Sequence, residues 1–246
     1  MFRDRKVFFY GHETRIRTRE NQMELIQLVD YALKSPDGGA ALQEVNFCLN
    51  RGDRVSIVAH ARHEVQLFMR GLASLVYPTK GGFFFQGKAL DFSDYRNLLP
   101  YKQKVGYIAS DMSLISNKSV RDNLMLMTHY FENSFSMTIP DDIMKLCNLF
   151  HLDTKLELRP TYLDPEKMRI AIIIREISKN PDILLIERPK EFLGVKSFDT
   201  LRSVLRRLMD KGIALVSYAL DEDFVNQFST REIVIAKGRV VENIVD

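Results

Sequence analysis

One stretch in the first third of the chain, VSIVAHARHEVQL at Val55–Leu67, joins an apolar run to a cluster of polar side chains. The imidazole, guanidinium and carboxylate groups of this cluster are types that hold metal ions or phosphates. His60 and His63 have H-x-x-H spacing and precede Glu64, but a metal site needs a third ligand at a defined distance. The remaining histidines lie far away in sequence: His12, His129 and His151. We therefore expect turn residues here and no metal.

Apolar runs of strand length alternate with helical patterns along the chain, which is typical of an α/β fold with a largely parallel sheet. RVSIVA (54–59) is continuous and rich in β-branched residues, so it suits a central strand buried on both faces. Other strands are expected at 23–33, 41–49, 104–110, 182–187 and 212–218. Helices are expected over 64–76, 167–179 and about 200–211, and the Met-rich stretch 112–163 has a mostly helical pattern. A hairpin over 232–243 should turn at Lys237–Gly238.

The composition favours a globular protein, because 46% of the 246 residues are hydrophobic and 27% are charged. No apolar run approaches the length of a membrane helix, and the N-terminus has no signal-peptide core. Cys48 and Cys147 stand among apolar residues without metal-ligand spacing. They are expected to be buried thiols of a reducing cytoplasm.

Residues 1–22 form a basic N-terminal extension with six basic and three acidic side chains, which accounts for the whole net charge of +3. The rest of the chain is balanced, so we expect no general affinity for nucleic acid. A basic extension can touch anionic lipid or nucleic acid, but a solvated tail is the simpler interpretation. Folded patterning begins at Met23, which could be a natural start.

The order and spacing of these segments resemble the ATP-binding subunits of ABC transporters, from about Met23 to the C-terminus. The matching segments are PTKGGFFFQGKAL (78–90), VGYIASD (105–111), NKSVRDNLML (117–126), YLDPEKMRIAIIIREISKNPDILLIERP (162–189), ALVSYA (214–219) and EIVIAKGRVVE (232–242). The resemblance implies an α/β, P-loop NTPase-like ABC ATPase fold, with a mainly parallel core sheet, an antiparallel β subdomain and a helical subdomain at about 111–164. Residues 23–246 would form this single ABC ATPase-like domain.

The residues at the family's nucleotide-binding positions do not match its chemistry. In the phosphate loop G-x-x-G-x-G-K-S-T, glycine amides and a lysine surround the phosphates and a hydroxyl holds Mg²⁺. This chain has Ala59, Arg62 and Glu64 at the glycines, Val65 at the lysine, Gln66 at the Mg²⁺ hydroxyl and Leu67 at the threonine. Glu64 would put a carboxylate where the triphosphate should lie. We therefore expect ATP and Mg²⁺ to be absent or weakly bound.

The other catalytic positions of the family are also replaced. The Q-loop glutamine corresponds to Ser110, the Walker B aspartate to Glu187, the general base to Arg188 and the switch histidine to Tyr218. The signature motif, which faces the partner's nucleotide in the family, has Leu163, Asp164, Pro165 and Glu166. We therefore expect a degenerate Walker A motif, no catalytic residue and a pseudo-ATPase. Tyr31 lies near the family's adenine-stacking aromatic, although a surface tyrosine at a strand end is the preferred interpretation.

The leading hypothesis is a catalytically inactive subunit of a membrane transport complex, peripheral on the cytoplasmic face of the membrane. It would bind a transmembrane permease, or a second ATP-binding subunit or another copy of itself as a dimer. One alternative is a divergent ATP-binding subunit that hydrolyses ATP with groups supplied by a partner. Another is a soluble regulatory module without a transporter.

Overall fold

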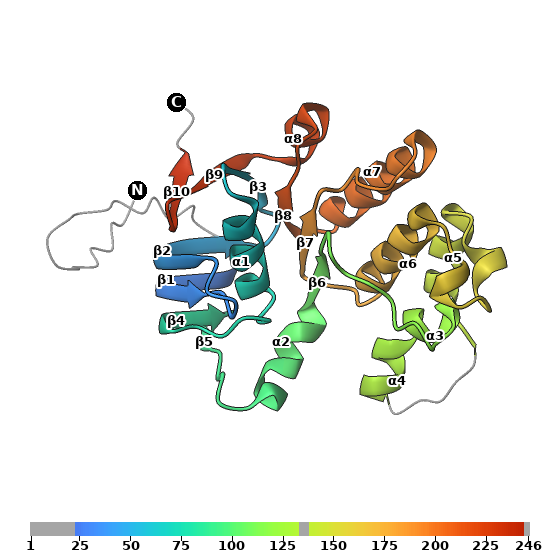
Figure 1. The fold of residues 1–246 in the computed structure, drawn as a ribbon, viewed down its shortest axis with the longest axis horizontal. Coiled ribbons are helices and arrows are strands. Elements are labelled where there is room, and N and C mark those ends of the chain that lie inside the picture. Colours follow the sequence, from blue (N-terminus) through green and yellow to red (C-terminus); the bar gives the residue numbers. More distant parts are fainter. Residues whose placement is uncertain (1–22, 133–137, 244–246) are drawn as a thin grey trace, which may run out of the picture.

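The computed structural model describes residues 23–132 and 138–243, so the predicted basic extension at residues 1–22 lies outside the described part of the chain. Its strands form two sheets, with β2-β1-β4-β5 in one and β10-β9-β3-β8-β7-β6 in the other (Figure 1). The strands are β1 (Glu24–Lys34), β2 (Ala41–Asn50), β3 (Arg54–Ala59), β4 (Lys80–Phe85), β5 (Lys88–Ala89), β6 (Val105–Ile108), β7 (Ile183–Glu187), β8 (Ala214–Tyr218), β9 (Arg231–Ala236) and β10 (Arg239–Asn243).

The larger sheet is parallel from β6 to β9, and β10 joins it as an antiparallel edge. β3 lies between β9 and β8, which confirms the central strand predicted from its continuous apolar run. The smaller sheet is antiparallel throughout. The expected combination of a mainly parallel core sheet with an antiparallel β unit is therefore confirmed.

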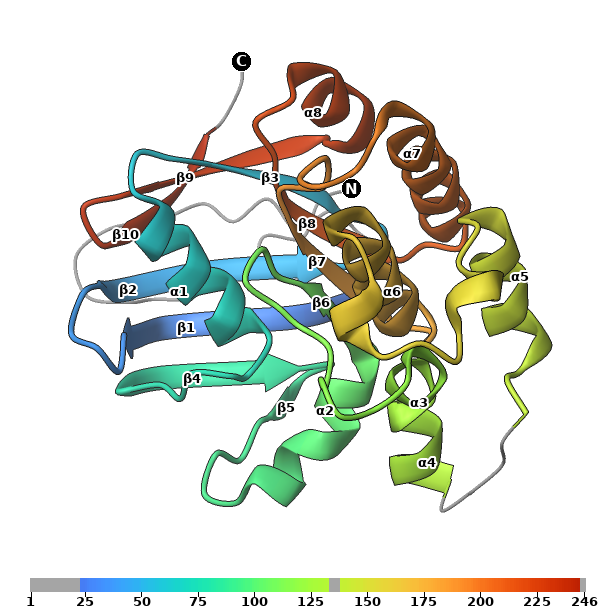
Figure 2. The same cartoon turned by 45° about the vertical axis from the view of Figure 1, so that its right-hand side comes forward.

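Helices cover both faces of the larger sheet. They are α1 (Arg62–Leu72), α2 (Leu99–Lys104), α3 (Val120–Leu124), α4 (Leu126–Glu132), α5 (Asp141–Leu149), α6 (Pro165–Ile177), α7 (Val195–Asp210) and α8 (Glu222–Phe228), with 3₁₀ turns at Tyr95–Leu98, Asp153–Lys155 and Pro160–Tyr162. Figure 2 shows α1 between the two sheets, with α6, α7 and α8 beyond the larger sheet. Within the described ranges, no helix is both long and apolar enough to cross a bilayer.

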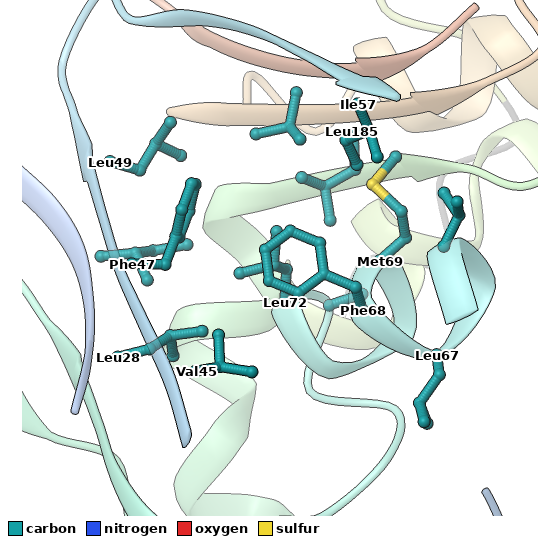
Figure 3. Packing of buried hydrophobic residues seen from close by; sticks show 14 of the residues in the cluster. Leu28, Val45, Phe47, Leu49, Ile57, Leu67, Phe68, Met69, Leu72 and Leu185 are labelled. Atoms are coloured by element: carbon teal, nitrogen blue, oxygen red, sulfur yellow. The ribbon is translucent and has the colours of Figure 1, made fainter. Parts of the chain in front are cut away.

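The apolar stripe of α1 explains its place between the sheets. Val65, Phe68, Met69 and Leu72 recur at helical spacing and are buried. In Figure 3, Phe68, Met69 and Leu72 lie among side chains of both sheets, and Phe68 meets the ring of Phe47 edge-on at 5.4 Å. Burying a side chain of this size stabilises the fold by roughly 1.5–3 kcal/mol. α1 therefore joins the two sheets through a common core.

Candidate functional site

The connection between β3 and α1 is much shorter than a phosphate loop. Only His60 and Ala61 separate the last residue of β3 from the first residue of α1, Arg62. Helix therefore covers most of the segment that the resemblance aligns with the glycine loop. Between residues 59 and 67, no residue has the left-handed backbone that such a loop takes from glycine. The segment therefore lacks the glycine-built loop of amide groups, while the first amides of α1 have no side-chain cap.

The side chains of this segment point to several different surroundings. Ala59 ends β3 half-buried against the core, while Val65 and Leu67 are buried in it. Gln66 lines a small cavity of about 70 Å³ beside the β1–β2 turn. Val65, which the resemblance aligns with the family's phosphate-binding lysine, is therefore a core residue.

Glu64 has its hydrogen-bond partner in the terminal hairpin. Its Oε1 accepts a hydrogen bond of 2.8 Å from the main-chain N–H of Gly238, in the turn between β9 and β10. The carbonyl of Gly238 accepts in turn from the N–H of Gln43 on β2, at 2.8 Å. Glu64 therefore fastens the terminal hairpin to α1, and the expectation that its carboxylate faces a triphosphate stays a prediction.

Three of the candidate residues do meet in space, around the end of β7. Glu187 is only 1% exposed, and its Oε2 accepts a hydrogen bond of 2.8 Å from the hydroxyl of Ser110. Arg62 donates to the same hydroxyl, at 2.7 Å. The other carboxylate oxygen of Glu187 accepts from the phenol of Tyr107. We call Arg62, Tyr107, Ser110 and Glu187 the acid cluster.

Sequence reasoning missed Tyr107. It lies on β6 opposite Leu185 of β7, so parallel register brings its ring close to the end of that strand. Burial, and then the neighbouring Glu187 carboxylate, raise the pKa of Tyr107 far above its ordinary value. The phenol therefore remains a proton donor to Glu187 at any physiological pH. The signal available in the sequence was that Tyr107 lies in a predicted strand and that another predicted strand ends in the acidic residue Glu187.

Arg169 was also missed, and it lies directly beneath the acid cluster. It is 3% exposed and belongs to α6. Its guanidinium donates to the carbonyl of Ala109 at 2.5 Å and to the carbonyl of Glu187 at 2.6 Å. Burial lowers the pKa of Arg169, while nearby carboxylates oppose this shift. A single arginine within the apolar run of a predicted helix was the signal in the sequence.

The residue after Glu187 is Arg188, and it is held firmly. Its backbone has φ +45°, and its N–H donates to the carbonyl of Tyr218 at 2.7 Å. Its guanidinium donates to Glu191 at 3.1 Å. Tyr218 ends β8 and is 8% exposed. These two candidate positions therefore lie side by side at the carboxyl edge of the sheet, next to the acid cluster.

The signature positions lie at the start of α6 and use their polar groups internally. Asp164 caps the helix by accepting from the N–H of Lys167 at 2.7 Å, and Pro165 occupies the first helical position. Glu166 accepts from the N–H of Gly194 at 2.8 Å. Leu163 precedes the cap and packs against the core shared by α6 and α7. Among described residues, no hydrogen bond or ion pair joins these four to the acid cluster.

Two further candidates have very different surroundings. His60 and His63 are exposed, and the described ranges contain no group of three or more His, Cys, Asp or Glu residues placed to hold a metal ion. Tyr31 is fully buried and meets Phe83 edge-on at 5.8 Å. The interpretation of Tyr31 as a surface tyrosine is wrong, and a ring enclosed in this way offers no face to adenine. The apolar side of β1 faces the core at this residue.

No protein-family model matches the chain, but curated proteins do. It is 27% identical over 206 residues to the methionine import ATP-binding protein MetN of Protochlamydia amoebophila, covering 82% of this chain and 59% of that protein. It is 24% identical over 222 residues to the phosphonates import ATP-binding protein PhnC 2 of Halalkalibacterium halodurans, covering 84% of this chain and 88% of the relative. The chain thus spans less than two thirds of MetN.

Solved structures share the fold at lower identity. The dimeric ABC transporter cassette MJ0796 superposes with a TM-score of 0.76 at 20% identity, covering 89% of this chain and 98% of that one. The same cassette bound to ADP and Pi gives 0.75 at 20% identity, with the same coverage. CbiO1 from Clostridium perfringens, part of the transporter complex cbiONQ, gives 0.66 at 18% identity, with 89% and 88% covered.

The comparisons overturn the expectation that ATP and Mg²⁺ are absent or weakly bound. The relatives are named ATP-binding proteins, and one structural neighbour holds ADP and Pi, so a nucleotide is the ligand of the proteins that this chain resembles. Residues 59–67 do not provide the glycine amides of a phosphate loop. The chain has the ABC ATPase fold, and along most of its length its sequence is similar to the ATP-binding subunits of ABC transporters.

Proposed function

We propose that this chain is the ABC-type subunit of a membrane transport complex and that its own site does not hydrolyse ATP. It lies on the cytoplasmic face of the membrane, contacts a transmembrane permease and pairs with a second ATP-binding subunit or with another copy of itself. The names of the import proteins MetN and PhnC 2, the dimeric cassette and the transporter complex of CbiO1 support this assembly.

The observation that carries the inactive site is Arg188, at the position where the family has its general base. A guanidinium remains protonated at any relevant pH, so it cannot accept a proton from an attacking water. The hydrogen bond of Arg188 to Glu191 and the bond from its N–H to Tyr218 fix it in place. The arginine is therefore held at this position by its own contacts in the folded chain.

The surroundings of Glu187 support the same conclusion. Both oxygens of this buried carboxylate already accept hydrogen bonds, from Tyr107 and Ser110. Proton transfer from water needs an acceptor that water can reach. Glu187 is 1% exposed and is engaged by both neighbours, so it serves here as a structural acceptor. Loss of the general base removes a group that contributes orders of magnitude to phosphoryl transfer.

A second candidate keeps ATP hydrolysis in this chain, with missing groups supplied by a partner. The acid Glu187, retained at the end of β7, favours it. The test begins with the complex recovered from detergent-solubilised membranes and compares its ATP turnover among variants. Under the first proposal, removal of the partner's phosphate-loop lysine abolishes turnover, whereas Glu187→Gln in this chain leaves it unchanged.

The matched control is Glu222→Gln, an exposed carboxylate in the first turn of α8. Loss of turnover in Glu187→Gln alone, with the complex still assembled, would establish the second candidate. A complex of this chain with itself and the permease should show no turnover at all. Recovery of soluble proteins only, without a multi-span partner, would favour a regulatory module. Nucleotide affinity is measured separately, because binding without hydrolysis agrees with the proposal.

A further inference from the structure

We infer that four arginines lock the segment after β6, so that the helices α3, α4 and α5 move with the sheets as one body. We call residues 109–115 the linker, and Arg62, Arg70, Arg169 and Arg175 the arginine clamp. The inference concerns the chain alone. It depends neither on transport nor on a nucleotide, so its failure and that of the proposed function are distinguishable.

The linker is where a hinge would be expected from the topology. The chain leaves the larger sheet at Ile108, the end of β6, and enters the next helix at Val120. No regular helix or strand lies between these two points. Hinges are a few residues in loops or at the ends of elements that absorb changes in φ and ψ. α3 and α5 also pack against α6 in a buried apolar core, so the linker and this packing together decide whether α3–α5 can turn relative to the sheets.

Two arginines reach the linker from α1, the helix between the sheets. Arg62 donates to the hydroxyl of Ser110 at 2.7 Å. Two turns further along the same helix, Arg70 forms an ion pair of 2.5 Å with Asp111. Both contacts lie toward the solvent, and the side chains of Arg70 and Asp111 are 38% and 50% exposed. Each such contact contributes little by itself, because water competes for exposed ion pairs.

The other two arginines come from α6, on the opposite face of the larger sheet. Arg169 donates to the carbonyl of Ala109 at 2.5 Å. Arg175 donates to the sulfur of Met112 at 2.9 Å and to the carbonyl of Ser113 at 3.5 Å. Five consecutive residues, 109–113, are thus contacted by guanidinium groups from two helices in different layers.

The clamp is held in shape by groups behind it. Arg175 pairs with Glu176 at 3.0 Å, where both side chains are largely buried. Glu176 also accepts from Lys179 and from the N–H of Tyr107 on β6, the latter at 3.2 Å. A planar guanidinium fixed in this way loses little further freedom when it binds the linker. The α6 side of the clamp is therefore preorganised.

The far end of the linker is fastened by a separate contact. The amide of Asn123 on α3 accepts from the N–H of Ile115 at 2.7 Å and donates to its carbonyl at 3.1 Å. Asn123 is fully buried. Because Ile115 is held by α3 itself, a turn of α3–α5 relative to the sheets would keep this bond and break the bonds from α1 and α6. The bond of Arg169 to Ala109 is buried and costly to break without replacement, and the more exposed contacts add to it, so the linker is not a free hinge.

The test measures a distance between the helices and the small sheet by double electron–electron resonance. Spin labels are placed at Lys145→Cys on α5 and Lys88→Cys on β5, both exposed, in the full chain with Cys48→Ser and Cys147→Ala. With the clamp intact, one narrow distance distribution is expected. The triple variant Arg62→Gln, Arg70→Gln, Arg175→Gln should broaden the distribution at least about twofold or add a second distance.

The matched control is Arg206→Gln with Arg207→Gln, two exposed arginines of α7 that take no part in the clamp. This control should leave the distribution unchanged. Circular dichroism verifies that each variant is folded, and the Arg62→Gln, Arg70→Gln double variant replaces the triple if that one does not fold. A broad distribution with the clamp intact, or the same narrow distribution in a folded clamp variant, would overturn the inference.

Discussion

Replacing Arg169 with methionine removes a buried charge that bridges two parts of the sheet edge. The guanidinium donates to two main-chain carbonyls at 2.5 and 2.6 Å, and hydrogen bonds to a charged group each contribute roughly 1.5–3 kcal/mol. Two effects act against this loss. Arg169 keeps a buried Nε without a partner among the described residues, and methionine avoids the desolvation of a charge. The expected net destabilisation is about 2–4 kcal/mol.

The assay is thermal and urea unfolding followed by circular dichroism. A loss of this size lowers the Tm of a chain of this length by about 4–16 °C. Arg206→Met, an exposed arginine on α7, is the control and should change the free energy of unfolding by less than about 0.5 kcal/mol. If Arg169→Met unfolds within about 1 kcal/mol of the parent chain, the carbonyls have other partners and Arg169 is not the support argued above.

The remaining predictions concern a turn, a thiol and a helix cap. Gly238→Ala should destabilise the chain by about 1–3 kcal/mol in urea unfolding, because φ is +75° and a Cβ would lie 2.8 Å from a main-chain oxygen of β2. Gly52→Ala, at φ +78° with open space around the residue, is the control and should destabilise the chain clearly less. Equal losses of stability in the two variants would contradict this reasoning. Burial, and to a smaller extent the nearby Glu24, raises the pKa of Cys48 to about 12. Iodoacetamide at about pH 8 should therefore alkylate Cys48 in the folded chain roughly a thousandfold more slowly than in the denatured chain, and the rate should increase as pH rises. Equal rates in the folded and denatured chains would refute this. Ser119→Ala should cost about 1 kcal/mol, since its hydroxyl accepts from the N–H of Asp122 in a capping box. The hydrogen bond with Ser119 lowers the pKa of Asp122, so its share of the stability is present above the unfolded pKa and is lost as pH falls through the lowered folded value; acid titration of the parent and Asp122→Asn should therefore converge at low pH.

The larger sheet could be predicted because its central strands appear in the sequence as short, nearly continuous apolar runs. A strand buried on both faces must be apolar at nearly every position, and RVSIVA and DILLIE satisfy this without reference to any partner. The terminal hairpin could be predicted for a different local reason. Lys237 and Gly238 both have positive φ, which a two-residue hairpin turn requires, and Gly238 adopts it readily.

The start of α1 was harder to predict. The helix was expected from Glu64, but it begins at Arg62. Alignment with a glycine loop suggests an irregular segment, whereas the residues actually present have no glycine to hold a loop open. The residues that replace glycine favour helix over loop, and the buried stripe from Val65 to Leu72 fixes the register of the turns that follow.

The acid cluster could be predicted only in part. Arg62, Ser110 and Glu187 were singled out one by one through the resemblance, but their mutual contact depends on how β3, β6 and β7 lie in the sheet. Tyr107 and Arg169 carry no local signature, because a tyrosine in a strand and an arginine in a helix are ordinary residues. Their roles follow from parallel register and from the packing of α6, which are long-range properties.

Among its own residues, the first turn of α1 is supported only by the Glu64 carboxylate, which is favourable at the positive end of the helix dipole. Ala61 at the N-cap has no side chain to accept from the free amides, and Arg62 places a cation at the positive end of the helix dipole. What else stabilises this turn is remote in sequence: Ser110 holds Arg62, and Gly238 holds Glu64. If these two anchors were cut, the turn would fray and the two-residue connection after β3 would lengthen. The register at which this helix begins is thus imposed by segments nearly fifty and more than one hundred and seventy residues away.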